Sequence, residues 1–311
     1  MHCCNKEGGN ALKKGKTALL HPSKRRKKET AVSLLFIAPL LLLTVSVTFL
    51  PIVTAYRWSL YDTKYLTLQE FVGLGNYKDI FTRGNAVGSI INSLWYVFGS
   101  LLLVFPAGIL LAVLLNQKLK GRAVFRTFII IPWVISQTIT AMLWRWIYNS
   151  SYGILTYLFQ ELFGARVEFL TEALPARLSL LVANFWNSTP IVIIMMLAAL
   201  QGISQNLYEA AKVDGSSAWQ TFWRITLPLL KPTIAITMVM QSMEYFNMVT
   251  LLNTMTDGGP FKSTMTLSVY AYREGFIYWH VGTSSAISIL ILLLNMIFSI
   301  LYIKLMSSRD S

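Results

Sequence analysis

Polar side chains recur at helical spacing inside a long apolar stretch near residue 240, where they could hydrogen-bond a solute. Gln241, Glu244, Tyr245 and Met248 follow the spacing i, i+3, i+4, i+7, and Asn247 flanks them. This spacing places the first four side chains on one face of a helix. Amide groups donate and accept hydrogen bonds, and a carboxylate accepts them. Together with an aromatic ring they suit a path for a carbohydrate.

A second polar set lies in two other apolar stretches, with Asn184 and Asn187 on one helix face and Gln137 in a separate helix. Polar groups at membrane depth face the interior of a bundle or a wet cavity, but they also hydrogen-bond between helices. A substrate path and interhelical packing therefore both stay open. Glu244 favours the path, because a carboxylate is costly in lipid. The path candidates are Gln137, Asn184, Asn187, Gln241, Glu244, Tyr245 and Asn247.

Residue patterns for catalysis, metal binding or nucleotide binding are missing from the sequence. The three histidines, His2, His21 and His280, are too scattered for a metal cluster or a catalytic triad. Gly15-Lys16-Thr17 ends like a phosphate-binding loop, but Asn10 stands where the first glycine belongs. We therefore expect no enzyme activity, no metal and no cofactor in this chain.

The elements that must position these side chains are membrane helices. The chain has 311 residues, of which 54% are hydrophobic and 13% charged, against about 25% charged in soluble domains. About 20 apolar residues are needed for one helical crossing of a bilayer. We predict an all-α polytopic bundle with six transmembrane helices, at 31–56, 90–115, 128–148, 178–200, 233–252 and 283–305.

The positive charge predicts the orientation of this bundle. Nine of the 27 Lys and Arg residues fall in the first 30 positions, so we divide the chain into a basic tail (1–30) and a transmembrane domain (31–311). Such a tail binds anionic lipid more readily than nucleic acid, and we expect no nucleic-acid partner. One set of connections carries 18 Lys and Arg and the opposite set carries 8. The excess places both termini in the cytoplasm of a multi-pass protein of the inner (cytoplasmic) membrane.

The connection 203–228 is polar but well patterned, and it predicts two short helices joined by a sharp turn. Ser204 can cap the first helix and Gly215 can end it, because glycine readily adopts the left-handed conformation. Ser216 can cap the second helix, and Pro228 is expected to end it. Docking to another protein and a free hairpin on the membrane surface are both compatible with this pattern.

The same segment resembles the EAA loop of ABC-importer permeases. Glu209-Ala210-Ala211 is followed after three residues by Gly215, and after nine more by Ile225-Thr226-Leu227-Pro228. Asp214, Phe222 and Pro232 also fit the carbohydrate-importing, maltose-type group of the binding-protein-dependent family. Ser204 and Ser216 depart from it, since proline and alanine are usual there. Weaker similarities lie at 71–77, 258–260 and 284–286.

The resemblance implies a coupling helix that contacts a separate ATP-binding subunit, which would hold ATP and Mg²⁺. The implied contact residues are Glu209, Ala210, Ala211, Asp214, Gly215, Leu227 and Pro228. It also implies a second, related permease subunit, an extracytoplasmic solute-binding protein, and a sugar or oligosaccharide as cargo. Two alternatives are a proton-coupled secondary transporter that uses Glu244 and an ABC importer for another solute.

Overall fold

The computed structural model describes residues 24–82, 84–117 and 121–307. Most of the predicted tail, including Cys3 and Cys4, lies outside the described residues. The chain divides into two compact units, residues 1–52 and 53–311. The first contains most of α1 (Lys24–Ser59), whose segment Leu35–Ser59 is apolar and long enough to cross a membrane. A helix that is apolar on all sides is typical of a membrane span.

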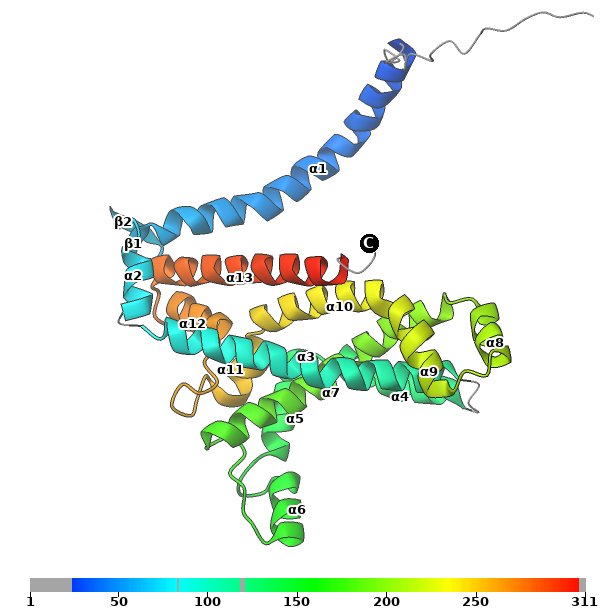
Figure 1. The fold of residues 1–311 in the computed structure, drawn as a ribbon. Helices are drawn as coiled ribbons and strands as arrows, with labels where there is room; N and C mark the ends of the chain where they lie inside the picture. The colour runs from blue at the N-terminus through cyan, green and yellow to red at the C-terminus, as the bar shows by residue number, and fades with distance from the viewer. Residues whose placement is uncertain (1–23, 83, 118–120, 308–311) are drawn as a thin grey trace, which may run out of the picture. The chain divides into compact units, whose positions relative to one another are not determined.

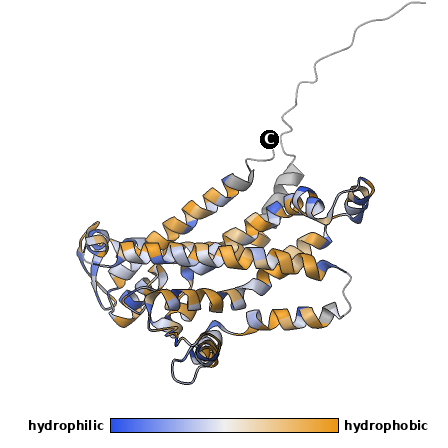
Figure 2. Cartoon of the chain, turned by 60° about the horizontal axis from the view of Figure 1, so that its bottom comes forward, coloured by the Kyte–Doolittle hydropathy of each residue, from blue (hydrophilic) through white to orange (hydrophobic). Residues whose placement is uncertain are grey.

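Four long helices form the body of the second unit: α3 (Ala86–Asn116), α7 (Ala173–Gln201), α10 (Leu227–Asn247) and α13 (Val281–Ser307) (Figure 1). Helices α3 and α7 pack closely together, and a β-carbon at Gly108 would lie 2.6 Å from Cγ1 of Val192. Small residues allow membrane helices to pack this tightly. Figure 2 shows apolar residues along the lengths of the helices and polar residues gathered in the connections.

The predicted third span, 128–148, is not one continuous helix. It is broken into α4 (Arg122–Val134) and α5 (Gln137–Ile147), which are bent by 96° with respect to each other. Extended backbone at Ile135 and Ser136 makes the break, and the Ser136 hydroxyl accepts a 3.4 Å hydrogen bond from the Ile139 amide. The serine satisfies an amide that the helix start leaves unpaired.

Among the described residues, four helices are long and apolar enough to span a membrane, or five if the bent pair counts as one span. They are the apolar part of α1, α3, α7 and the α13 segment Val281–Lys304. Helix α10 is not among them, because Lys231, Gln241 and Glu244 lower its mean hydropathy. A sixth span therefore stays a prediction.

The prediction of an all-α chain misses a small antiparallel hairpin, β1 (Tyr61–Lys64) and β2 (Thr67–Phe71). β-Branched and aromatic residues favour strands, and Tyr61 and Phe71 pair edge to face across the strands at 5.3 Å. Short helices complete the unit: α2 (Gly75–Thr82), α6 (Ile154–Phe163), α11 (Thr250–Thr256), α12 (Leu267–Tyr272) and the π-helical turn η2 (Arg273–Ile277).

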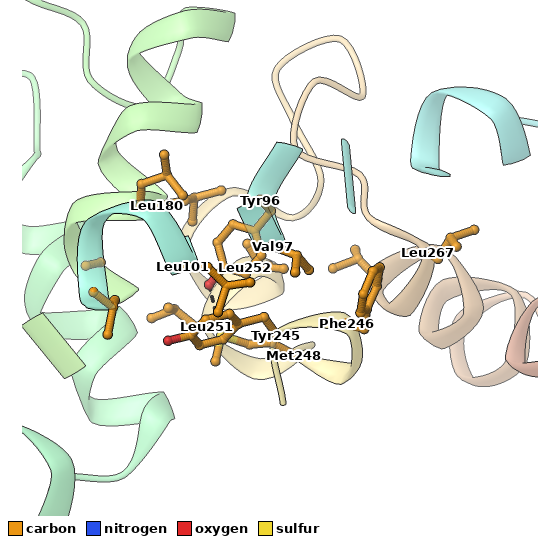
Figure 3. Close-up of a cluster of buried hydrophobic side chains, with 14 of the residues drawn as sticks. Tyr96, Val97, Leu101, Leu180, Tyr245, Phe246, Met248, Leu251, Leu252 and Leu267 are labelled. Carbon is orange, nitrogen blue, oxygen red and sulfur yellow. Dashed lines mark hydrogen bonds between the residues drawn. The ribbon is translucent and has the colours of Figure 1, made fainter. Parts of the chain in front are cut away.

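The core takes buried side chains from α3, α7, α10, α11, α12 and α13, and Figure 3 shows the part of it around Tyr96, Tyr245 and Leu252. Tyr245 and Phe246 of α10 are 1% exposed and Leu252 of α11 is fully buried. The Tyr96 hydroxyl of α3 donates a hydrogen bond to Sδ of Met248 at 3.0 Å. This packing fixes the rotation of α10 about its axis and so decides which of its polar residues turn away from the core.

Candidate functional site

The first candidate site is the elbow, which we define as residues 204–226 with the short helices α8 (Gln205–Val213) and α9 (Ala218–Thr221). Gly215 has φ +75°, as its type predicts. The Ser216 amide donates to the Ala211 carbonyl at 2.9 Å, which closes the end of α8. Ser204 is at the N-cap position of α8, but its side chain makes no capping hydrogen bond.

The second half of the elbow differs from the sequence prediction at two points. The N-cap of α9 is Ser217 rather than Ser216, and Ser217 forms a reciprocal capping box with Gln220. Pro228 does not end the helix. A π-helical turn, η1 (Phe222–Thr226), continues into α10, and the Leu227 amide donates to the carbonyl of Phe222. In the π-helical turn each amide bonds to the carbonyl five residues earlier instead of four. The helix therefore continues through Pro228 and Pro232, which have no amide hydrogen to donate.

The elbow lies at the end of the second unit opposite to β1, β2 and α2 (Figure 1). Glu209, Ala210 and Asp214 are exposed, whereas Ala211 is 5% exposed. Large apolar side chains are exposed beside them, with Val213 at 88% and Trp219 at 70%. An exposed apolar surface next to a charged residue is typical of a protein-binding site.

A contact inside the elbow links α8 to the turn that continues into the bundle. The hydroxyls of Tyr208 in α8 and Thr226 in η1 lie 3.3 Å apart, and Thr226 is buried. Because η1 is continuous with α10, this contact connects α8 to the helix that carries Gln241 and Glu244.

Four of the seven path candidates are buried and hydrogen-bonded within the bundle. Asn184 donates to Ser100 Oγ of α3 at 2.9 Å. Asn187 donates to the carbonyl of Pro132 at 2.8 Å, and Gln241 donates to the Tyr245 hydroxyl at 3.0 Å. The bonds of Asn184 and Asn187 join α7 to other helices, whereas the Gln241–Tyr245 bond lies within α10. All of them favour packing within the bundle over solute binding for this group.

The other three candidates are more accessible. Glu244 and Asn247 are exposed and Gln137 is half-buried. The Gln137 amide lies 3.5 Å from Oε1 of Glu244, whereas Asn247 donates to the Met243 carbonyl of its own helix at 2.7 Å. The break between α4 and α5 places Gln137 at the first position of α5, where it can meet α10.

Sequence reasoning missed a buried polar network at the other end of the bundle. Arg177 of α7 donates to Oδ1 of Asn92 in α3 at 2.7 Å and to the Ser263 carbonyl at 2.9 Å. Asn92 in turn donates to the carbonyls of Lys262 and Met265. The network ties α3 and α7 to the loop before α12. No spacing rule joins residues 85 positions apart, so the sequence carries no local signal for it.

Comparison with known proteins decides the family. Residues 104–306 match the sequence model described as "Binding-protein-dependent transport system inner membrane component". The chain is 33% identical over 286 residues to the trehalose/maltose transport system permease protein MalF of Thermococcus litoralis, covering 91% of this chain and 96% of that one. The chain belongs to this permease family. The match includes the whole elbow and the path candidates.

Other relatives cover a similar share. The trehalose permease SugA of Mycobacterium tuberculosis is 28% identical over 291 residues, 93% of each chain. The sn-glycerol-3-phosphate permease UgpA of Agrobacterium fabrum is 28% identical over 262 residues, 84% of this permease and 89% of UgpA.

A solved structure shows the same fold. A crystal structure of a bacterial ABC transporter involved in alginate import aligns with a TM-score of 0.80 at 24% identity, covering 93% of the permease and 100% of the aligned chain. The family is one of transport components rather than enzymes.

Proposed function

We propose that this permease is a subunit of an ATP-driven importer that moves a sugar or oligosaccharide delivered by an extracytoplasmic binding protein. Support for a sugar comes from relatives named as trehalose/maltose and trehalose permeases. Support for a binding protein comes from a related alginate transporter solved with its alginate-bound periplasmic protein. One relative is named for sn-glycerol-3-phosphate, so a polar solute other than a sugar is the alternative cargo.

The observation that carries the proposal is the exposed elbow at one end of the bundle. Its α8 presents Glu209 and Ala210 to the outside, with Leu207 and Val213 beside them. These apolar side chains would be buried against a separate ATP-binding subunit, which would supply ATP and Mg²⁺. Movement of α8 would reach α10 through Tyr208 and Thr226, because η1 and α10 are continuous. Such a rigid connection suits a switch between two states of the bundle.

In this proposal the elbow faces the cytoplasm and the hairpin β1–β2 faces outward, with both termini cytoplasmic. The larger number of Lys and Arg on the elbow side supports this orientation. α10 would be the sixth span despite its polar residues, because Gln241 is buried among neighbouring helices and Glu244 would face the solute path rather than lipid. A second, related permease subunit would complete the channel and cover the exposed side of α10.

For the path itself, Glu244, Gln137 and Asn247 are the strongest candidates, because they are accessible and lie at the open side of α10. Carboxylate and amide groups can replace the hydration of sugar hydroxyls. The proton-coupled alternative assigns Glu244 a different role, but it leaves the exposed elbow without a partner.

The test is to purify the full permease with its co-expressed ATP-binding and permease partners, in liposomes with sugar-loaded binding protein. Ala210→Trp should remove sugar-stimulated ATP hydrolysis while the permease remains folded, because a bulky ring on the exposed face of α8 blocks close packing. Ala165→Trp, at an exposed position outside the elbow, is the matched control. The proposal fails if no ATPase subunit copurifies, or if Ala210→Trp transports like the wild type.

A further inference from the structure

A small pocket at the elbow end of the bundle belongs neither to the elbow nor to the path. It has a volume of about 260 Å³ and lies between the end of α3, α4 and the last turns of α7. Most of its lining is apolar. The lining residues are Leu115, Arg126, Ile129, Ile130, Ile193, Ile194, Leu197, Ala198 and Gln201.

One side chain in this lining is out of place in an apolar pocket. Arg126 is half-buried, and its Nε and Nη2 atoms are buried without any hydrogen-bond partner among the described residues. No carboxylate from the described part of the chain lines the pocket. Burying the donors of a permanently charged group without a partner is costly, so the site is incomplete without an anion.

The other residues that line the pocket indicate which kind of anion would bind there. Branched aliphatic side chains from α4 and α7 continue from the guanidinium along the pocket, and these favour an acyl chain over a free, hydrated ion. Helix α4 also exposes Val124, Phe125 and Phe128. Large apolar side chains of this kind are favourable in contact with lipid.

We propose that this pocket binds an anionic phospholipid, with Arg126 holding the headgroup phosphate and Ile129, Ile194 and Leu197 contacting the acyl chain. Guanidinium groups bind phosphate through charge-assisted hydrogen bonds, and basic pockets between helices on the cytoplasmic side recognise anionic headgroups. The assignment to the inner leaflet rests on the proposed orientation, whereas the lipid site itself rests on the pocket alone.

Native mass spectrometry of the detergent-purified complex, titrated with dioleoylphosphatidylglycerol, tests the site. We expect Arg126→Gln to lower the affinity of one phosphatidylglycerol site at least tenfold, since a hydrogen bond to a charged group is lost. Ala198→Phe keeps the arginine and fills the pocket from its exposed side, and it should lower the affinity similarly. Lys304→Gln removes an exposed charge from α13 and should leave binding unchanged.

Three outcomes would overturn the inference. Equal binding of phosphatidylglycerol and phosphatidylcholine would show that the pocket does not recognise the charge of the headgroup. Displacement of the lipid by glycerol phosphate alone would mean that the site takes a free phosphate. A disulfide formed by Ala198→Cys with the second permease subunit would show that protein, not lipid, covers the pocket. Failure of ATPase coupling in the same preparation would count against the proposed function without affecting this result.

Discussion

The side-chain amide of Gln137 lies 3.5 Å from Oε1 of Glu244, although 107 residues separate them in the sequence. One residue opens α5 after the sharp break, and the other lies on the accessible side of α10. This contact joins α5 and α10, two of the three helices that carry the predicted path residues. It also leaves the carboxylate accessible rather than buried in the core.

Glu244→Gln should distinguish a solute-binding side chain from a proton carrier. We expect uptake to fall by about tenfold, because the amide keeps a neutral hydrogen bond in place of a charged one, and the difference between the two is about 1–1.5 kcal/mol. Glu244→Ala should lower the uptake rate further, because alanine makes no side-chain hydrogen bond. Measurement of initial uptake rates in liposomes between pH 6 and 8 checks this. A complete loss of uptake in Glu244→Gln, with a strongly pH-driven flux in the wild type, would favour the proton-coupled alternative.

Asn184→Ala should destabilise the bundle by about 0.5–2 kcal/mol, since hydrogen bonds between membrane helices contribute about this much. Asn184 links α7 to Ser100 of α3 and also accepts a hydrogen bond from Ser188. Thermal unfolding in detergent measures the loss. Asn247→Ala is the matched control, because Asn247 is exposed and bonds only to its own helix. Equal effects in the two variants would contradict the packing role.

Gly215→Ala should uncouple ATP hydrolysis from transport while costing only about 1–2 kcal/mol in stability, the cost of a β-carbon in the left-handed region. Apart from Gly215 itself and its two chain neighbours, no atom of the described residues lies within 4 Å of the added carbon, so the effect is conformational. Gly164→Ala is the control, since Gly164 has φ +64° and equally open surroundings outside the elbow. Both variants should unfold at similar temperatures, and only Gly215→Ala should lose coupling. A loss of coupling in both would show general destabilisation instead.

Ser217→Ala should cost about 1 kcal/mol locally, because the serine is the N-cap of α9. Faster amide hydrogen exchange at residues 218–221 would report the loss. Ser216→Ala should leave exchange unchanged, since the reciprocal capping box belongs to Ser217. The reverse result would restore the assignment of the cap to Ser216.

Gly108→Val should disrupt the contact of α3 with α7, because a β-carbon there would overlap Val192. Overpacking of this kind costs about 1–3 kcal/mol. The double variant with Val192→Ala should recover much of the unfolding temperature. If the double variant is no more stable than Gly108→Val alone, the two positions are not in contact as described.

The positions of the helices were largely predictable, because lipid demands long apolar runs and these stand out locally. Boundaries of α3 and α7 follow the expected 90–115 and 178–200 closely. The break at Ile135 and Ser136 was missed, since the run 128–148 as a whole is apolar enough for a single span and no glycine marks the break. The continuous passage from η1 through Pro228 was missed because proline normally predicts a helix end.

By itself the sequence determined the membrane character, the left-handed turn at Gly215 and the resemblance to ABC-importer permeases, because each depends on residues close together in the chain. Only the tertiary structure separated the polar candidates, with Asn184, Asn187, Gln241 and Tyr245 buried and Gln137, Glu244 and Asn247 more accessible. Helical periodicity places side chains on a common face, but the rotation of that face toward core or cavity depends on packing against distant helices.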